Sequence, residues 1–116
     1  MAKILIVDDS NFIKTIMKSI LAEGGYTNVI EAENGKEAIE KTVSESPDLV
    51  LLDIVMGDMD GLEVLKQIGT KTKVCMVTAI GQDDTVKKAT EMGAVGYIMK
   101  PFEKKNILET VKKLLV

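Results

Sequence analysis

The sequence predicts a doubly wound α/β fold of the (βα)5 type, in which helices cover both faces of a five-stranded parallel sheet. Five short apolar runs alternate strictly with five segments whose apolar residues recur at helical spacing. Strands joined through helices form right-handed crossovers, and such units build a parallel sheet. The chain has 116 residues, 46% of them apolar, so we expect residues 1–116 to form a single domain around one core.

Each expected strand is a short apolar run bounded by turn-forming or charged residues. The central run, residues 49–55, lies between Pro47 and a cluster of Gly and Asp residues. All its residues except Asp53 are apolar, which is typical of a strand buried on both faces. The expected strands are residues 3–7, 28–33, 49–55, 74–77 and 95–99.

The expected helices combine apolar spacing with start and stop signals. Asn34 and Asp60 have the spacing of N-caps that are followed by an acidic residue three positions later, and Gly or Pro residues supply the stops. We expect the second helix to direct Ala38, Ile39, Thr42 and Val43 toward the core. The final helix, which includes residues 107–115, is amphipathic and continues to the terminus.

Polar side chains follow or interrupt four of the five strands near their ends. Asp8-Asp9 follow the first strand, Asp53 lies in the third, Thr78 follows the fourth and Lys100 follows the fifth. Because the carboxyl ends of parallel strands share one edge, where ligands bind, these distant residues should be neighbours.

The chemistry of this edge favours a metal and a phosphoryl group. Carboxylates this close repel one another unless a cation joins them, and an all-oxygen donor set with two or three carboxylates suits Mg²⁺ better than Ca²⁺. Lys100 and Thr78 add a positive charge and a hydroxyl donor for a tetrahedral anion. Asp53 is the expected nucleophile because it stands alone on the central strand. The simpler alternative is that Asp8 and Asp9 cap the first helix and Asp53 pairs with Lys100.

The same residues carry a resemblance to a known family. Over its whole length the chain resembles the response-regulator receiver domain in its stand-alone CheY-like form. The resemblance implies a flavodoxin-like sheet with strand order 2-1-3-4-5. The residues that carry it are Asp8-Asp9, Asp53, Met56 with Met59-Asp60-Gly61, Thr78-Ala79 and Lys100-Pro101-Phe102.

The resemblance implies a signalling switch of a two-component system rather than an enzyme, one that takes part in its own phosphorylation and autodephosphorylation. Asp53 would accept a phosphoryl group from a histidine kinase or phosphotransfer protein. Mg²⁺ would be bound by Asp9, Asp53 and the main-chain carbonyl of Val55, with Asp8 acting through a water molecule. Lys100 would contact a phosphoryl oxygen.

The resemblance also implies how the signal leaves the site. Thr78, followed by Ala79, would move toward the phosphoryl group, and Tyr97 would then swing inward. This movement would remodel the surface of the fourth helix, fifth strand and fifth helix. The Lys100-Pro101 peptide bond would be cis. A phosphoryl group adds about two negative charges, so a nearby hydroxyl gains a strong hydrogen bond by closing in.

Two outputs remain open within this interpretation. The chain either carries a chemotaxis signal to a motor or adaptor protein, which Tyr97 and the Gly-Gln-Asp-Asp segment at residues 81–84 favour, or relays phosphate to another histidine. Phe12, if exposed beside Asp9, would dock the kinase or phosphotransfer helix. We expect a monomer.

The chain departs from the family at Gly57, where proline is usual, so the loop after Asp53 should be less restrained. Val55 and Ile80 are apolar at positions that can hold polar groups near a hydrolytic water. We therefore expect a long-lived phosphoryl group.

Two other classes are weaker alternatives. A flavin- or nucleotide-binding domain would need a phosphate loop after the first strand, where two aspartates stand instead. A phosphatase with an Asp nucleophile would need a further acid to protonate the leaving group.

Composition narrows the remaining classes. The net charge is −3, and the chain has 15 Lys and Arg residues together and no His; all 15 are Lys, which argues against a nucleic-acid surface. Cys75 lies in an apolar run and is expected to be buried. No run has the length of a signal peptide core or a membrane span, so we expect a cytoplasmic protein with no membrane partner.

Overall fold

The computed structural model describes residues 2–55, 59–79 and 83–115. Within these ranges, five parallel strands pair in the order β2-β1-β3-β4-β5, which confirms the predicted doubly wound sheet. The strands are β1 (Ile4–Val7), β2 (Val29–Ala32), β3 (Leu49–Asp53), β4 (Lys73–Ala79) and β5 (Gly96–Lys100). The helices are α1 (Asn11–Glu23), α2 (Gly35–Glu45), α3 (Gly61–Ile68), α4 (Asp83–Glu91) and α5 (Lys104–Leu114).

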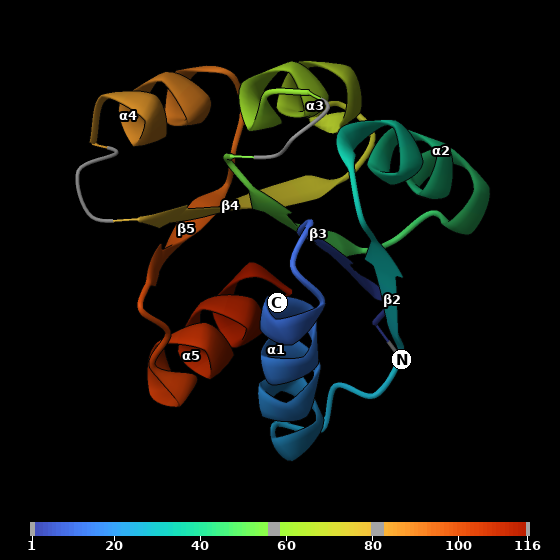
Figure 1. Cartoon of the computed structure of the whole chain (residues 1–116), viewed down its shortest axis with the longest axis vertical. Helices are drawn as coiled ribbons and strands as arrows, with labels where there is room; N and C mark the ends of the chain where they lie inside the picture. Colours follow the sequence, from blue (N-terminus) through green and yellow to red (C-terminus); the bar gives the residue numbers. More distant parts are fainter. Residues whose placement is uncertain (1, 56–58, 80–82, 116) are drawn as a thin grey trace.

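The helices form a layer on each face of the sheet (Figure 1). Helices α2, α3 and α4 lie on one face, and α1 and α5 lie on the other. Successive strand residues point to opposite faces, so β1 contributes Leu5 and Val7 to one core cluster and Ile4 and Ile6 to the other. Every residue of β1 and β3 is buried, as expected for strands covered on both faces.

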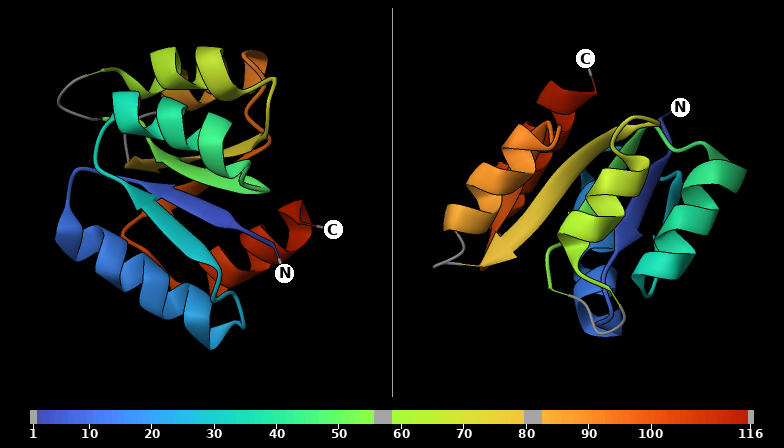
Figure 2. Two further views of the ribbon diagram at one scale, coloured as in Figure 1. Left: turned by 90° about the vertical axis from the view of Figure 1, so that its right-hand side faces the viewer. Right: turned by 90° about the horizontal axis from the view of Figure 1, so that it is seen from above.

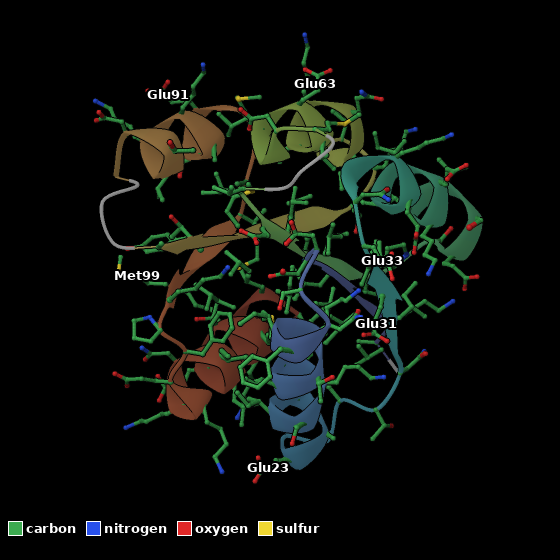
Figure 3. All side chains as sticks on the ribbon, viewed as in Figure 1. Glu23, Glu31, Glu33, Glu63, Glu91 and Met99 are labelled. Carbon is green, nitrogen blue, oxygen red and sulfur yellow. The ribbon has the colours of Figure 1, made fainter. Side chains whose placement is uncertain are left out.

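The strands run in one direction, so their carboxyl ends share one edge of the sheet. The beginning of β1 and the end of α5 lie together near the opposite edge (Figure 2). Polar side chains such as Glu63 and Glu91 project from the outer sides of α3 and α4 (Figure 3). No helix in the described part of the chain is both long and apolar enough to cross a membrane.

Side-chain caps fix where three of the helices begin. The predicted N-caps are confirmed: the Asn34 side chain accepts a hydrogen bond from Glu37 N at 2.8 Å, and that of Asp60 from Leu62 N at 2.8 Å. The N-cap of α1 is Ser10, whose hydroxyl accepts from Ile13 N at 3.2 Å. Asp8 and Asp9 therefore do not supply this cap.

The structure differs from the expectations at several element ends. β3 ends at Asp53, which confirms that this carboxylate lies at the strand end, although the apolar run continues to Val55, which is exposed. Val43, expected in the core, is exposed, because it follows the buried Thr42 by about 100° around α2. The predictions made for Met56, Gly57, Ile80, Gly81 and Gln82 lie outside the described residues, and α4 is described from Asp83.

Candidate functional site

The strand ends place the predicted polar residues at one edge of the sheet. Asp53 is the last residue of β3, and Asp8 follows β1 directly. The two strands pair in register up to Val7 and Leu52, so Asp8 and Asp53 continue that pairing side by side. Lys100 is the last residue of β5, two strands away from β3.

Three carboxylates converge at this edge. Asp8, Asp9 and Asp53 each offer one oxygen, and these atoms all lie within 4.8 Å of one another. Asp8 and Asp53 are only 2% and 6% exposed, whereas Asp9 is open to solvent. Such an oxygen-only cluster, with a buried and an open side, could hold a hard divalent cation that keeps some of its water.

The Lys100 ammonium lies between the two buried carboxylates. Its Nζ donates a hydrogen bond to Asp53 Oδ2 at 3.3 Å and lies 3.8 Å from Asp8 Oδ2. The alternative pairing of Asp53 with Lys100 is thus present, but one ammonium cannot balance three carboxylates. The remaining negative charge favours a further cation at the same place.

Burial perturbs one member of the cluster strongly. The pKa of Asp8 is raised from 3.8 to about 6: removal from water is the main cause and the nearby Asp53 carboxylate adds to it, while the Ser10 N–H and Lys100 act in the opposite direction. The Ser10 N–H donates to Asp8 Oδ1 at 2.9 Å. A bound cation would favour the ionised form of Asp8 and displace its proton.

An open cavity of about 290 Å³ adjoins Asp53. It is lined by residues from the ends of three strands and the turn after β3: Asp9, Asp53, Ile54, Val55, Val77, Thr78, Ala79 and Lys100. The predicted residues Thr78 and Ala79 therefore face the same space as Asp53. The Thr78 hydroxyl is buried, and its partner among the described residues is its neighbour's carbonyl oxygen, Ala79 O, at a long 3.3 Å, so it can be recruited by a better acceptor.

The turn after β3 is held close to the strand end. The Val55 N–H donates to Asp53 Oδ1 at 3.2 Å, and the Gly61 N–H donates to Ile54 O at 2.9 Å. A Cβ on Gly61 would lie 2.6 Å from Asp53 O, so only glycine permits this approach. Val55, the predicted source of a main-chain metal ligand, is 65% exposed at the mouth of the cavity.

The predicted switch residue Tyr97 lies on the edge strand β5 and is 52% exposed. Met99, two residues further, points to the same face of the sheet and pairs across the ladder with Thr78. Its side chain projects at the outer edge of the sheet (Figure 3). The Lys100-Pro101 peptide bond is cis, the isomer that the resemblance implies.

Phe12 lies in the first turn of α1, three residues after Asp9, and is 73% exposed. It is therefore not part of the core, although it begins the apolar pattern of that helix. Val55, which lines the cavity, and Phe12, three residues along the chain from Asp9, are both exposed apolar side chains.

Sequence reasoning found the charged groups but missed some of their supports. It did not assign Ser10 as the N-cap of α1 or as a donor to Asp8, although a serine before a helix is a common N-cap signal. It also missed the contact between Met59 and Gly35, where a Cβ on Gly35 would lie 3.0 Å from the Met59 Sδ. No local signal in the sequence indicates that contact.

Comparison with known proteins agrees with this geometry. The family model described as "Response regulator receiver domain" matches residues 4–112. The chain is 44% identical to the "Chemotaxis protein CheY" of Bacillus subtilis, over 97% of each chain. It is 39% identical to the "Sporulation initiation phosphotransferase F" of the same organism, over 97% of this chain and 93% of the relative.

A solved structure of a chemotaxis protein has the same fold as this chain. The chemotaxis protein CheY4 of Vibrio cholerae superposes with a TM-score of 0.90, at 31% identity and over 99% of each chain. The likeness therefore extends to the whole sheet and both helix layers.

Proposed function

This chain belongs to the response regulator receiver domain family, and on that premise we propose that it accepts a phosphoryl group on Asp53 and signals in chemotaxis. The observation that carries the proposal is the position of Asp53. Its carboxylate ends the central strand beside two further aspartates, with the Lys100 Nζ at 3.3 Å. No other aspartate of the cluster both lines the cavity and contacts Lys100.

We propose Mg²⁺ as the cation of this site. The fit rests on the donor set of three carboxylate oxygens within 4.8 Å of one another, whose charge the single ammonium of Lys100 does not balance. Asp9, Asp53 and the Val55 carbonyl would hold the ion, and Asp8 would act through a water molecule. When bound, Mg²⁺ supplies positive charge that offsets the negative charge of the phosphoryl oxygens.

The transfer itself needs little chemistry from this chain. An Asp53 carboxylate oxygen attacks the phosphorus of a phosphohistidine on a histidine kinase, the P–N bond breaks as the O–P bond forms, and the imidazole leaves. Lys100, placed beside Asp53, contacts a phosphoryl oxygen and limits the repulsion between the two anions. Attack by water on the acyl phosphate later returns the carboxylate and releases inorganic phosphate, so the chain is a switch that takes part in its own reset.

The output follows from the new charge. The Thr78 hydroxyl, which makes a long contact of 3.3 Å with Ala79 O, gains a charge-assisted hydrogen bond by moving toward a phosphoryl oxygen. The Tyr97 ring, about half exposed here, then moves inward and changes the surface of α4, β5 and α5. A partner that prefers this changed surface shifts the population toward it.

Different relatives support different destinations for the phosphoryl signal. The chemotaxis proteins among the relatives favour docking to a motor or adaptor protein. The sporulation phosphotransferase favours the alternative, transfer onward to a phosphotransfer histidine, at lower identity. In both cases the exposed Phe12 beside Asp9 would dock the helix that carries the histidine. A cytoplasmic location, where such a kinase presents its histidine, remains part of the proposal.

Incubation with acetyl phosphate and Mg²⁺ tests the proposed function. We expect stoichiometric labelling of the wild-type chain, seen as a single added phosphoryl group by intact mass spectrometry, and none in Asp53→Asn or with a chelator. Continuous release of phosphate in large excess over protein would instead indicate a phosphatase. Purification of the chain with a bound yellow chromophore would indicate a flavin-binding domain.

A further inference from the structure

The loop between β3 and α3, described at residues 54–55 and 59–60, is supported at Met59 by α2, a helix that carries none of the site residues. We propose that the N-terminal turn of α2 positions this loop for Mg²⁺ by clamping Met59, so that Met59 and Gly35 are positioning residues of the metal site. The inference deepens the proposed function and rests on it to the extent that the site binds Mg²⁺.

The loop is closed at its base by direct backbone contact. Gly61, the first residue of α3, donates its N–H to Ile54 O at 2.9 Å. A Cβ at Gly61 would lie 2.6 Å from Asp53 O and 2.7 Å from Ile54 Cα. These are backbone atoms that cannot move aside without shifting the end of β3. The position of Gly61 therefore fixes the end of the loop relative to Asp53.

Met59 holds the end of the loop next to α3 by packing against the core. It precedes Gly61 by two residues, and its partly buried side chain packs against the core cluster on the face of the sheet covered by α2, α3 and α4. A Cβ on Gly35 would lie 3.0 Å from both the Met59 Cβ and the Met59 Sδ, and 2.8 Å from a methyl carbon of Val64. Met59 thus fills the space between α2 and α3, and the absence of a side chain on Gly35 makes room for it.

The α2 end that holds Met59 is itself well anchored. Gly35 is buried, and Asn34 before it caps the helix by accepting the Glu37 N–H at 2.8 Å. The β2–α2 connection starts beside Asp8, because Asp8 N donates to Ala32 O at 3.2 Å. The supporting turn is therefore tied to the same strand ends that carry the carboxylates.

The chemical role of the clamp is to hold the main-chain carbonyl of Val55 beside Asp53. A main-chain ligand has no rotamer freedom of its own, so its direction depends on the loop that carries it. Groups that orient metal ligands typically change affinity by about 10–100-fold when they bond to the ligand directly. Met59 acts through packing and not through a bond to a metal ligand, so we expect a smaller effect on Mg²⁺ affinity, of roughly threefold to tenfold.

Mg²⁺ binding to the full chain provides the test. We expect Met59→Ala to weaken the Mg²⁺ dissociation constant, measured by isothermal titration calorimetry and by amide NMR shifts, by roughly threefold to tenfold. Met59→Leu, which keeps an apolar side chain of similar volume, should restore most of the affinity. Gly35→Ala, which pushes on Met59 from the other side, should weaken it in the same direction.

A matched control separates positioning from general loss of packing. Ile20→Ala removes the same number of side-chain heavy atoms from a partly buried residue of the other core cluster, in the last turn of α1. It should lower the free energy of unfolding comparably and leave Mg²⁺ affinity unchanged. Equal Mg²⁺ affinity of Met59→Ala and the wild type, or an equal loss in Ile20→Ala, would overturn the inference while the proposed function stands. A wild-type chain that binds no Mg²⁺ would overturn both.

Discussion

Replacing Asp8 with asparagine should make the metal-free protein more stable while removing its ability to bind Mg²⁺ tightly. Asp8 is 2% exposed and lies beside Asp53, and the cation that the described residues place near it is Lys100, at 3.8 Å. Its ionised form is therefore disfavoured in the folded chain. Asparagine keeps the shape and can still accept the Ser10 N–H that Asp8 accepts at 2.9 Å, but it carries no charge.

The magnitude follows from the raised pKa of Asp8. Folding moves this pKa from 3.8 to about 6. Each unit corresponds to about 1.4 kcal/mol, so ionised Asp8 lowers the free energy of unfolding at neutral pH by at most about 3 kcal/mol relative to its protonated form. Because Asp53 and Lys100 respond to the substitution, we expect a gain of about 1–3 kcal/mol in Asp8→Asn, or roughly 4–12 °C in Tm for a domain of this size.

The sign of the pH dependence is fixed by the direction of the shift. A carboxyl whose pKa is raised by folding contributes stability that is fully present below its unfolded value of 3.8 and is lost as pH rises through about 6. Wild-type stability in a chelating buffer should therefore fall over this window relative to that of Asp8→Asn. The two curves should approach each other near pH 4.

Urea and thermal denaturation in EDTA measure the effect, with Asp60→Asn as the control. Asp60 caps α3 from an exposed position, and asparagine is an equally good N-cap, so Asp60→Asn should change stability by less than about 0.5 kcal/mol. Added Mg²⁺ should raise the Tm of the wild type and leave that of Asp8→Asn nearly unchanged. If Asp8→Asn is no more stable than the wild type in EDTA, the buried charge of Asp8 does not destabilise the folded chain as we infer.

Three further substitutions test separate parts of the site. Val55→Asn places an amide at the mouth of the cavity, where it can orient a water toward the acyl phosphate. It should shorten the lifetime of the phosphorylated chain severalfold, as measured by timed mass spectrometry. An unchanged lifetime would refute this. Lys100→Met leaves Asp53 and Asp8 without their ammonium and should lower metal-free stability by about 1–3 kcal/mol in urea denaturation. Phe12→Ala should slow transfer from a phosphohistidine domain but not labelling by acetyl phosphate, so equal slowing of both would exclude docking.

Most of the fold could be predicted because strand and helix patterns are local. The apolar runs located all five strands, and glycine, proline and capping residues located most helix ends. Val43 was placed wrongly in the core, because an apolar residue next to the buried face of a helix looks the same in the sequence whether or not another element covers it. Asp53 was correctly expected at the end of β3, although Ile54 and Val55 continue the apolar run beyond the strand.

The sequence predicted which residues meet at the site, but it predicted less well how each side chain is held. Parallel strands share an edge, so the residues at their ends had to be neighbours. The sequence did not distinguish buried Asp8 from exposed Asp9, since the difference depends on the direction of the chain as it leaves β1. Nor could it reveal that Met59 packs against Gly35, because that contact joins residues 24 positions apart through the packing of α2 on α3.

The central claim is that Asp53, among three converging aspartates, carries the phosphoryl group. Borohydride reduction of the acetyl phosphate-treated chain converts an aspartyl phosphate to homoserine, and peptide mass spectrometry then locates it. We predict homoserine at position 53 alone and only when Mg²⁺ was present. Homoserine at position 8 or 9, or equal conversion at position 53 in the presence of EDTA, would contradict the account.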